Sequence, residues 1–372
     1  MADYEPMGDE EFAAWTSQSH PEPLDTSPDA GDGVLLTPLS GVTMRRAKFA
    51  WEPRLPLGAL TVVAGVPGVA KSHLAVEVAA RLTRGQLPGD LSATPVDVVI
   101  ASAEDALASV LVPRFTAAGA DLARVHSVSL HRDGLDLGIT IPDDLDSLGV
   151  AMRSVGARLL VVDPLLAHIP VRIDGYKDQH VRVALAPLAR LAEELDAAVL
   201  GIMHLNKRET VDLFSRLGGS GGFLAAARSA LLVATDPQDE DVRVAAHGKA
   251  NLSPTAQALR FRLEGREILN PDPEDPAPIR VAAVVWLGEA DLEVSDLLGS
   301  NRGTARADAI SWLAAELANG PMPEEWVRKA AEDAGHSWAT LRRAKADLGV
   351  VSERSGFGPG GRWEWTLQSR SE

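Results

Sequence analysis

The residues best suited to chemistry lie where apolar runs end in polar side chains. The segment GVPGVAKS follows one such run and precedes a helical pattern. Glycines let backbone N–H groups approach an anion, Lys71 supplies positive charge, and the Ser72 hydroxyl can ligate Mg²⁺. We therefore expect a phosphate-binding loop for ATP and Mg²⁺. Its residues would be Gly65, Val66, Pro67, Gly68, Val69, Ala70, Lys71, Ser72 and His73.

Ala70 departs from the usual form of such a loop, which has glycine directly before the lysine. Glycine adopts backbone angles that a Cβ penalises, and it lets phosphates approach closely. Because a methyl group is small, we expect a modest distortion with ATP binding and hydrolysis retained. An ordinary strand–turn–helix with a chance Lys-Ser pair is the alternative interpretation.

Three further apolar runs end in groups that nucleotide hydrolysis needs. Asp163 ends RLLVVD and is the candidate Mg²⁺ ligand, while Glu104 follows VVIASA and is the candidate base that activates water. His204 ends AAVLGIMH and could contact the γ-phosphate. Ligands of open α/β sheets bind at the carboxyl ends of strands, so we expect these groups near the loop. Solvated or helix-capping side chains are the alternative.

The elements that must position these groups alternate along the chain. Apolar runs at 59–64, 96–102, 158–163, 197–204 and 229–235 are typical of buried parallel strands. Helical patterns cover 71–85, 106–119 and 181–195, and period-two alternation beyond residue 235 predicts antiparallel strands at one sheet edge. This pattern predicts an α/β fold with a central, mostly parallel sheet.

Composition and charge narrow the class of protein. The formal net charge is -16, and residues 1–40 carry nine acids and no Lys or Arg. We expect a disordered acidic tail there, with a possible role in binding replication proteins. The chain has no cysteine, no apolar leader and no run long enough to span a bilayer. We therefore expect a cytoplasmic protein without membrane association.

The C-terminal part has a different character. We expect one domain at 41–289, a linker at 290–303 and a second domain at 304–368. Three amphipathic helices and a strand–turn–strand in that last segment predict a winged helix-turn-helix. Arg342, Arg343 and Lys345 lie on its third helix and could contact DNA. Residues 304–372 contain nine basic and ten acidic residues, so docking to a protein remains an alternative.

The order of the motifs resembles a known family. GVPGVAKS, SAEDA, VVDP, HLNK, RLGGSGGFLAAAR and GKANLSP resemble RecA-like P-loop ATPases, and among these the RepA-type hexameric replicative helicases of the DnaB-like group. The resemblance spans roughly residues 45–270. It implies that Lys71, Glu104 and His204 act on the chain's own nucleotide. It also implies that Arg228, an arginine finger, and Lys249 act on a neighbour's nucleotide in a hexameric ring.

The resemblance also implies where DNA is bound. The loop at 207–222 would line a central channel and contact single-stranded DNA through Lys207, Arg208 and Arg216; a disordered surface loop is the alternative. The chain departs from the family pattern at Ala70, in its lack of an N-terminal primase-like or helical domain, and in its extra C-terminal module.

Three functions stay open at this point. The first is an ATP-driven, ring-forming helicase or translocase that acts on single-stranded or duplex DNA in the replication of a phage, plasmid or mobile element. The second is a RecA-like DNA-binding ATPase that acts as a regulatory, loading or recombination factor without unwinding. The third is a scaffold that binds nucleotide without turnover.

Overall fold

The computed structural model describes residues 36–132, 135–175, 177–205, 221–275, 277–298, 302–318, 320–336, 338–355 and 362–367. The chain divides into two units, Met1–Ala47 and Lys48–Glu372. Most of the predicted acidic tail lies outside the described residues. Within residues 36–47 the chain forms one short 3-10 helix, η1 (Leu39–Gly41), whose residues are all exposed.

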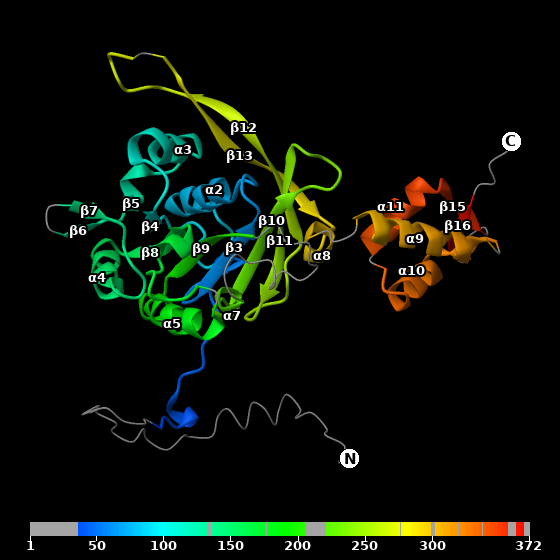
Figure 1. The fold of residues 1–372 in the computed structure, drawn as a ribbon, viewed down its shortest axis with the longest axis horizontal. Coiled ribbons are helices and arrows are strands. Elements are labelled where there is room, and N and C mark those ends of the chain that lie inside the picture. Colours follow the sequence, from blue (N-terminus) through cyan, green and yellow to red (C-terminus); the bar gives the residue numbers. More distant parts are fainter. Residues whose placement is uncertain are drawn as a thin grey trace. The chain divides into compact units, whose positions relative to one another are not determined.

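A nine-stranded sheet forms the centre of the second unit (Figure 1). Its order is β13-β12-β11-β10-β3-β9-β8-β4-β5. The parallel strands are β3 (Leu60–Gly65), β4 (Asp97–Ser102), β5 (Val125–Ser127), β8 (Ala157–Asp163), β9 (Ala198–His204) and β10 (Ser229–Thr235). The antiparallel strands are β11 (Val242–Ala250), β12 (Ala258–Ile268) and β13 (Ile279–Ala290). The predicted parallel sheet with antiparallel strands added at one edge is confirmed.

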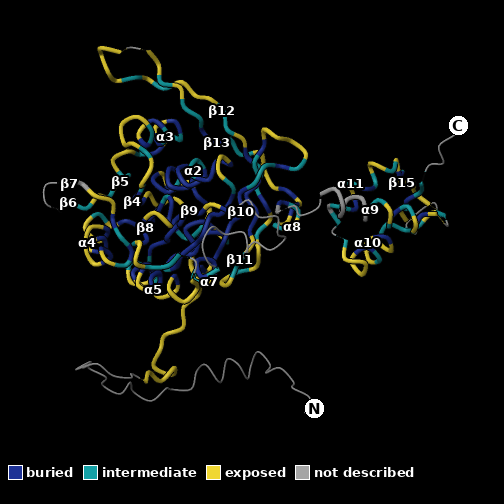
Figure 2. The backbone as a smooth tube through the Cα atoms, viewed as in Figure 1, coloured by how far each residue is buried: buried dark blue, intermediate teal, exposed yellow. Residues whose placement is uncertain are grey.

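Successive side chains along the buried strands point to opposite faces of the sheet, so they contribute to two apolar cores, one on each face. On β8, Leu160 and Val162 belong to the core that includes residues of α4 (Leu145–Val155) and α5 (Asp178–Leu195). Leu159 and Val161 belong to the core that includes residues of α2 (Lys71–Thr83) and α3 (Val112–Ala117). Figure 2 shows the central strands buried between these helices. The core is therefore a three-layer α/β/α arrangement.

Several elements differ from the sequence expectation. The helix expected at 106–119 begins as a π-helix, η2 (Leu107–Leu111), and continues as α3. The short strands β6 (Leu130–Arg132) and β7 (Leu135–Leu137) were not expected, because such short runs hold too few residues to establish a period. The helix α4, with 11 residues, was not recognised in the sequence either. The remaining short elements of this part are β1 (Phe49–Trp51), β2 (Leu55–Pro56), η3 (Leu122–Arg124), η4 (Leu165–His168) and α7 (Gly222–Ala226).

Part of the segment expected to be a linker is structured. Residues 294–298 form α8 (Val294–Leu298), and Leu292 and Leu297 are buried in the apolar core of the sheet. The expectation failed because two buried leucines among many polar residues give too weak a pattern to recognise. Between α8 and the next helix, residues 299–301 lie outside the described part of the chain.

The C-terminal residues build an apolar core of their own. It contains Leu313, Val327, Leu341 and Trp365, among others. The helices are α9 (Arg302–Leu317), α10 (Glu324–Asp333) and α11 (Trp338–Asp347), and the strands are β14 (Met322–Pro323), β15 (Val350–Ser355) and β16 (Arg362–Leu367). The expected three helices and hairpin are present, with β14 as an added short strand. The assignment of these elements to a winged helix-turn-helix, and its function, stay predictions.

No helix among the described residues combines the length and apolar character needed to cross a bilayer.

Candidate active site

The predicted phosphate-binding loop connects a buried strand to a helix. β3 ends at Gly65, the loop runs from Val66 to Ala70, and α2 begins at Lys71. A Cβ at Gly65 would lie 2.3 Å from the Val233 carbonyl oxygen of β10, so only glycine fits there. Gly68 has a φ of +82°, which glycine adopts without penalty. The backbone therefore has the strand–loop–helix context that phosphate binding requires.

Ala70 adopts the backbone conformation for which glycine is normally used. Its φ is 69° and its ψ is 28°, in the left-handed region, directly before the first residue of α2. This conformation costs an alanine about 1–2 kcal/mol. Ala70 is 8% exposed and belongs to the apolar core that includes Leu74 of α2. The methyl group thus sits in the protein interior, and the backbone keeps the geometry of a glycine-containing loop.

Lys71 is buried against the loop that precedes it. Its Nζ donates hydrogen bonds of 2.9 Å to the carbonyl oxygens of Gly65 and Val66. Burial lowers the pKa of Lys71 to about 8, and the negative charge of Asp163 partly opposes this effect. An ammonium group has three N–H bonds. Lys71 can therefore keep both loop contacts and direct one more hydrogen bond towards a phosphate oxygen.

Ser72 and Asp163 meet at the carboxyl end of the sheet. Their side chains form a hydrogen bond, and both line a small pocket together with Ser102 and Asp105. Burial raises the pKa of Asp163, and its neighbours Asp105 and Glu104 raise it further, whereas the Ser72 hydrogen bond lowers it. A half-buried carboxylate beside other acids is an environment that a divalent cation would neutralise.

The oxygen donors at this position suit Mg²⁺. Mg²⁺ is usually bound through one or two protein oxygens, with waters and substrate phosphates as its other ligands. Ser72 and Asp163 supply such a pair. No cluster of three or more His, Cys, Asp or Glu side chains able to cage a metal occurs in the described part of the chain.

The two acids that follow β4 have different surroundings. Asp105 forms a 2.6 Å ion pair with Arg114 of α3, while Glu104 is exposed. The register pairs Ser102 at the end of β4 with Asp163 at the end of β8, and both acids that follow β4 act on the pKa of Asp163, Asp105 more strongly than Glu104. Because Arg114 engages Asp105, Glu104 remains the candidate base. The contribution of Arg114 could not be recognised in the sequence.

His204 lies at the same sheet edge as the loop. In the register of β3 and β9 it is paired with Gly65. The pKa of His204 lies below its ordinary value because of partial desolvation and the charge of Lys71, whereas Glu104 and Asp163 act in the opposite direction. The pKa of His73 is lowered by burial and by Arg114. Both histidines thus stand in the electrostatic field of the candidate site.

Arg228 and Lys249 lie at the opposite edge of the sheet, the edge that the amino ends of the parallel strands form. The Arg228 backbone N–H bonds to the Leu60 carbonyl at the beginning of β3, whereas the phosphate-binding loop follows the end of β3. Arg228 is exposed. The Lys249 Nζ donates a 2.8 Å hydrogen bond to the Leu224 carbonyl of α7, and burial followed by the charge of Arg228 lowers its pKa. The structure thus brings these two cations together, away from the chain's own loop.

A buried polar network, unmarked in the sequence, supports this second edge. The Ser229 hydroxyl donates to the Arg54 carbonyl (2.6 Å) and lies 3.0 Å from His247 Nε2. His247 Nδ1 accepts from the Ala256 N–H, so Nε2 carries the proton and donates to Ser229. Burial lowers the pKa of His247 to about 4, and its imidazole therefore stays neutral at ordinary pH. The network fixes the residues adjacent to Arg228 and Lys249.

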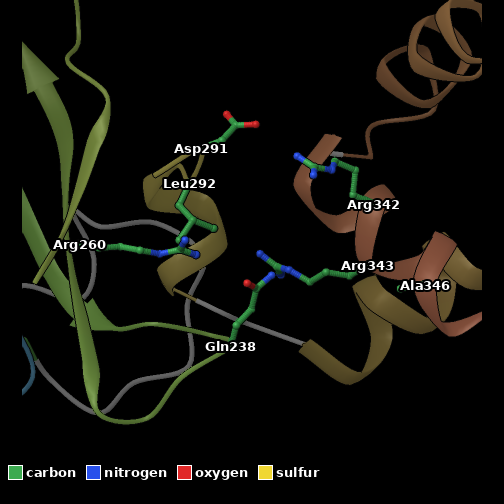
Figure 3. Close-up of a pocket in the computed structure, with 7 residues that line it drawn as sticks. All are labelled: Gln238, Arg260, Asp291, Leu292, Arg342, Arg343 and Ala346. Atoms are coloured by element: carbon green, nitrogen blue, oxygen red, sulfur yellow. The ribbon is translucent and has the colours of Figure 1, made fainter. Parts of the chain in front are cut away.

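The predicted DNA-binding residues fall into two groups. Lys207, Arg208 and Arg216 lie outside the described residues. Arg342 and Arg343 extend from α11 (Figure 3), and Arg342 is exposed whereas Arg343 is half-buried. Lys345 is also half-buried, and its Nζ lies 4.2 Å from the centre of the Trp365 ring and bonds to Ser352. The attraction between an ammonium and an indole face explains this position of Lys345.

Comparison with known proteins supports the nucleotide site. Residues 36–210 match the model of a family described as an AAA domain. This match covers the phosphate-binding loop together with Glu104, Asp163 and His204. No curated protein matches the chain. The family match and the parallel-dominated sheet together support an ATPase core of the RecA-like P-loop class.

Proposed function

We propose that the protein is an ATP-driven, ring-forming DNA helicase or translocase of the RepA type, acting in the replication of a phage, plasmid or mobile element. The observation that carries this proposal is the separation of two sets of charged groups. Lys71, Ser72 and Asp163 meet at one sheet edge, while Arg228 and Lys249 meet at the other. Such a division supports hydrolysis at interfaces between subunits.

At the first edge, each side chain has a role in phosphoryl transfer. Lys71 binds the terminal phosphates, and Ser72 with Asp163 would hold Mg²⁺, which neutralises charge on the phosphate oxygens. Glu104 orients the attacking water and accepts its proton. His204, on the strand next to that of Asp163, contacts the γ-phosphate and can transmit its loss to the segment that follows β9.

At the second edge, Arg228 is too far away to reach its own chain's nucleotide. It adjoins Leu60, and Leu60 and Gly65 are five residue steps apart along an extended strand, a distance of about 16 Å. A guanidinium group stabilises the transition state only by direct contact with the γ-phosphate. Arg228 therefore serves a neighbouring subunit, with Lys249 beside it. The closed arrangement that supplies every site with a neighbour is a ring.

The decisive experiment measures ATPase rate with and without single-stranded DNA, on particles whose oligomeric state is determined in the same buffer. The proposal expects stimulated turnover by a ring, together with ATP-dependent strand displacement. Lys71→Ala serves as the control that removes nucleotide binding. If DNA stimulates turnover but no duplex is unwound, the chain is a DNA-binding ATPase with a regulatory, loading or recombination role. If Lys71→Ala binds ATP normally, the assignment of the loop is wrong.

A further inference from the structure

The C-terminal β-hairpin has two chemically different faces. Cross-strand pairing places Arg354 opposite Trp363 and Ser352 opposite Trp365. Between these pairs lies Glu353 opposite Glu364. Because successive side chains of a strand point to opposite faces, the tryptophans and Arg354 share one face and the two glutamates occupy the other. The acidic residues that offset the basic charge of this module are thus partly segregated from the tryptophan face.

The buried part of the tryptophan face is already occupied. Trp338 of α11 stacks on Trp365, with ring centres 5.3 Å apart and planes inclined by 25°. Lys345 lies over Trp365, and Arg328 lies 5.6 Å from the centre of Trp338. Each indole of this stacked pair has a cation over its ring, and these contacts stabilise the module. The contact with Trp365 also removes Lys345 from the set of freely projecting cations on α11.

Trp363 is the exposed continuation of this face. It lies two residues along β16 from Trp365, yet its exposed fraction is 56%, against 1% for Trp365. Next to Trp365 is a pocket of about 540 Å³, which Arg342, Lys345 and Glu324 also line, and Glu324 accepts a 3.1 Å hydrogen bond from Trp365 Nε1. An exposed indole near a pocket with two cations and one carboxylate is suited to a ligand that combines aromatic rings with negative charge.

We propose that this face binds single-stranded nucleic acid, with the Trp363 indole stacked on an unpaired base and with Arg354 and Arg342 facing phosphates. Bases in a duplex are covered by their neighbours, whereas those of a single strand leave a face on which an aromatic ring can stack. Glu353 and Glu364 lie on the other face, and Glu324 is engaged by Trp365 Nε1. The cations Arg342, Lys345 and Arg354 therefore outnumber the one acid that the structure describes at the tryptophan face. The proposal does not depend on ATP hydrolysis. It adds a second strand-binding site to the proposed function.

Photo-crosslinking to full-length protein without nucleotide locates the contact. The probe is an oligonucleotide in which 5-iododeoxyuridine replaces thymidine, used single-stranded or annealed to its complement, with adducts mapped by mass spectrometry. We expect an adduct at Trp363 with the single strand and none with the duplex. An adduct at Trp363 with the duplex alone, or adducts confined to other residues, would overturn the proposal. A protein-docking function predicts no adduct in this module.

Affinity measurements with matched variants distinguish aromatic stacking by Trp363 from the effect of side-chain size alone. Trp363→Ala is expected to weaken binding of the single strand by about 5- to 150-fold. Trp363→Phe should restore most of this loss, while Trp363→Leu, which keeps apolar volume without an aromatic face, should not. Arg354→Gln should reduce the dependence of affinity on salt concentration by about one phosphate contact. Glu353→Gln, on the opposite face, is the control and should weaken nothing. Equal losses for Phe and Leu would refute stacking.

The same measurements distinguish this proposal from the proposed function. With Lys71→Ala, which lacks nucleotide binding, the Trp363 adduct should persist. If the protein hydrolyses ATP and unwinds DNA but Trp363 gives no adduct, only the present inference fails. If the Trp363 adduct forms but no strand is displaced, only the helicase assignment fails.

Discussion

Ala70 shows how a strained residue can be tolerated in a phosphate-binding loop. Ala70→Gly relieves about 1–2 kcal/mol of left-handed strain. The substitution also costs about 0.8 kcal/mol of stability for the buried methyl that it removes. It costs about a further 0.4–1 kcal/mol, because glycine raises the conformational entropy of the unfolded chain. These terms nearly cancel, so we expect the free energy of unfolding in urea to change by less than about 1 kcal/mol. The β-branched variant Ala70→Val should lose more than about 2 kcal/mol. Full stability in Ala70→Val would show that the loop does not need this conformation.

Lys71 gives nucleotide binding a pH dependence. Its folded-state pKa of about 8 lies below the ordinary lysine value of 10.5, so the unfolded chain binds more protons between these pH values. This group's contribution to the stability of the nucleotide-free protein therefore rises with pH across that window. Phosphates favour the charged amine and raise its pKa. ATP binding should thus take up a proton above pH 8, and affinity should fall as pH rises through that value.

Calorimetry in buffers of different ionisation enthalpy measures the proton uptake directly. We expect more protons taken up at about pH 9 than at about pH 7. Lys71→Arg is the matched control, because a guanidinium keeps its charge throughout this range. Equal uptake at both pH values in the unchanged protein would mean that Lys71 is not the group that titrates on binding.

At the scale of elements, Glu77 and Trp286 join the phosphate-loop helix to the long β12–β13 hairpin. Glu77 of α2 is buried, forms a 2.6 Å ion pair with Arg81 and accepts a 3.0 Å hydrogen bond from Trp286 Nε1. Glu77→Ala leaves the indole N–H without its acceptor, and we expect a loss of about 1–3 kcal/mol in the free energy of unfolding. Glu77→Gln keeps an acceptor and should lose less. Equal losses in denaturant titrations would show that the hydrogen bond to Trp286 contributes nothing.

The sequence allowed the order of these elements to be predicted, but not their placement in the sheet. Apolar runs ending in Glu104, Asp163 and His204 identified the strands, because buried strands are continuous in sequence. The insertion of β9 and β8 between β3 and β4 depends on long-range pairing, which local patterns do not record. The same limit applies to the Arg114–Asp105 ion pair and to the position of Lys345 over Trp365. Each partner there comes from a different element.

At the scale of the whole molecule, the proposed arrangement makes each active site a joint product of two subunits. One contributes Lys71, Ser72, Glu104 and Asp163, and its neighbour contributes Arg228 and Lys249. The two sets occupy opposite edges of the same sheet, so every subunit in a ring would donate at one edge and receive at the other. This arrangement predicts that defects at the two edges complement each other.

Mixing two inactive variants tests this prediction. Lys71→Ala should fail to bind nucleotide but keeps Arg228. Arg228→Ala should bind ATP but lacks the arginine that the neighbouring active site needs. Each alone should be inactive in ATP turnover. Rings assembled from both should regain part of the activity, because some interfaces pair an intact loop with an intact arginine. The double variant Lys71→Ala/Arg228→Ala, mixed with either single variant, is the control. Such rings contain no interface that pairs an intact loop with an intact arginine, so they should regain no ATP turnover. If well-mixed rings regain no ATP turnover, or if Arg228→Ala alone hydrolyses ATP at the normal rate, catalysis in trans is contradicted.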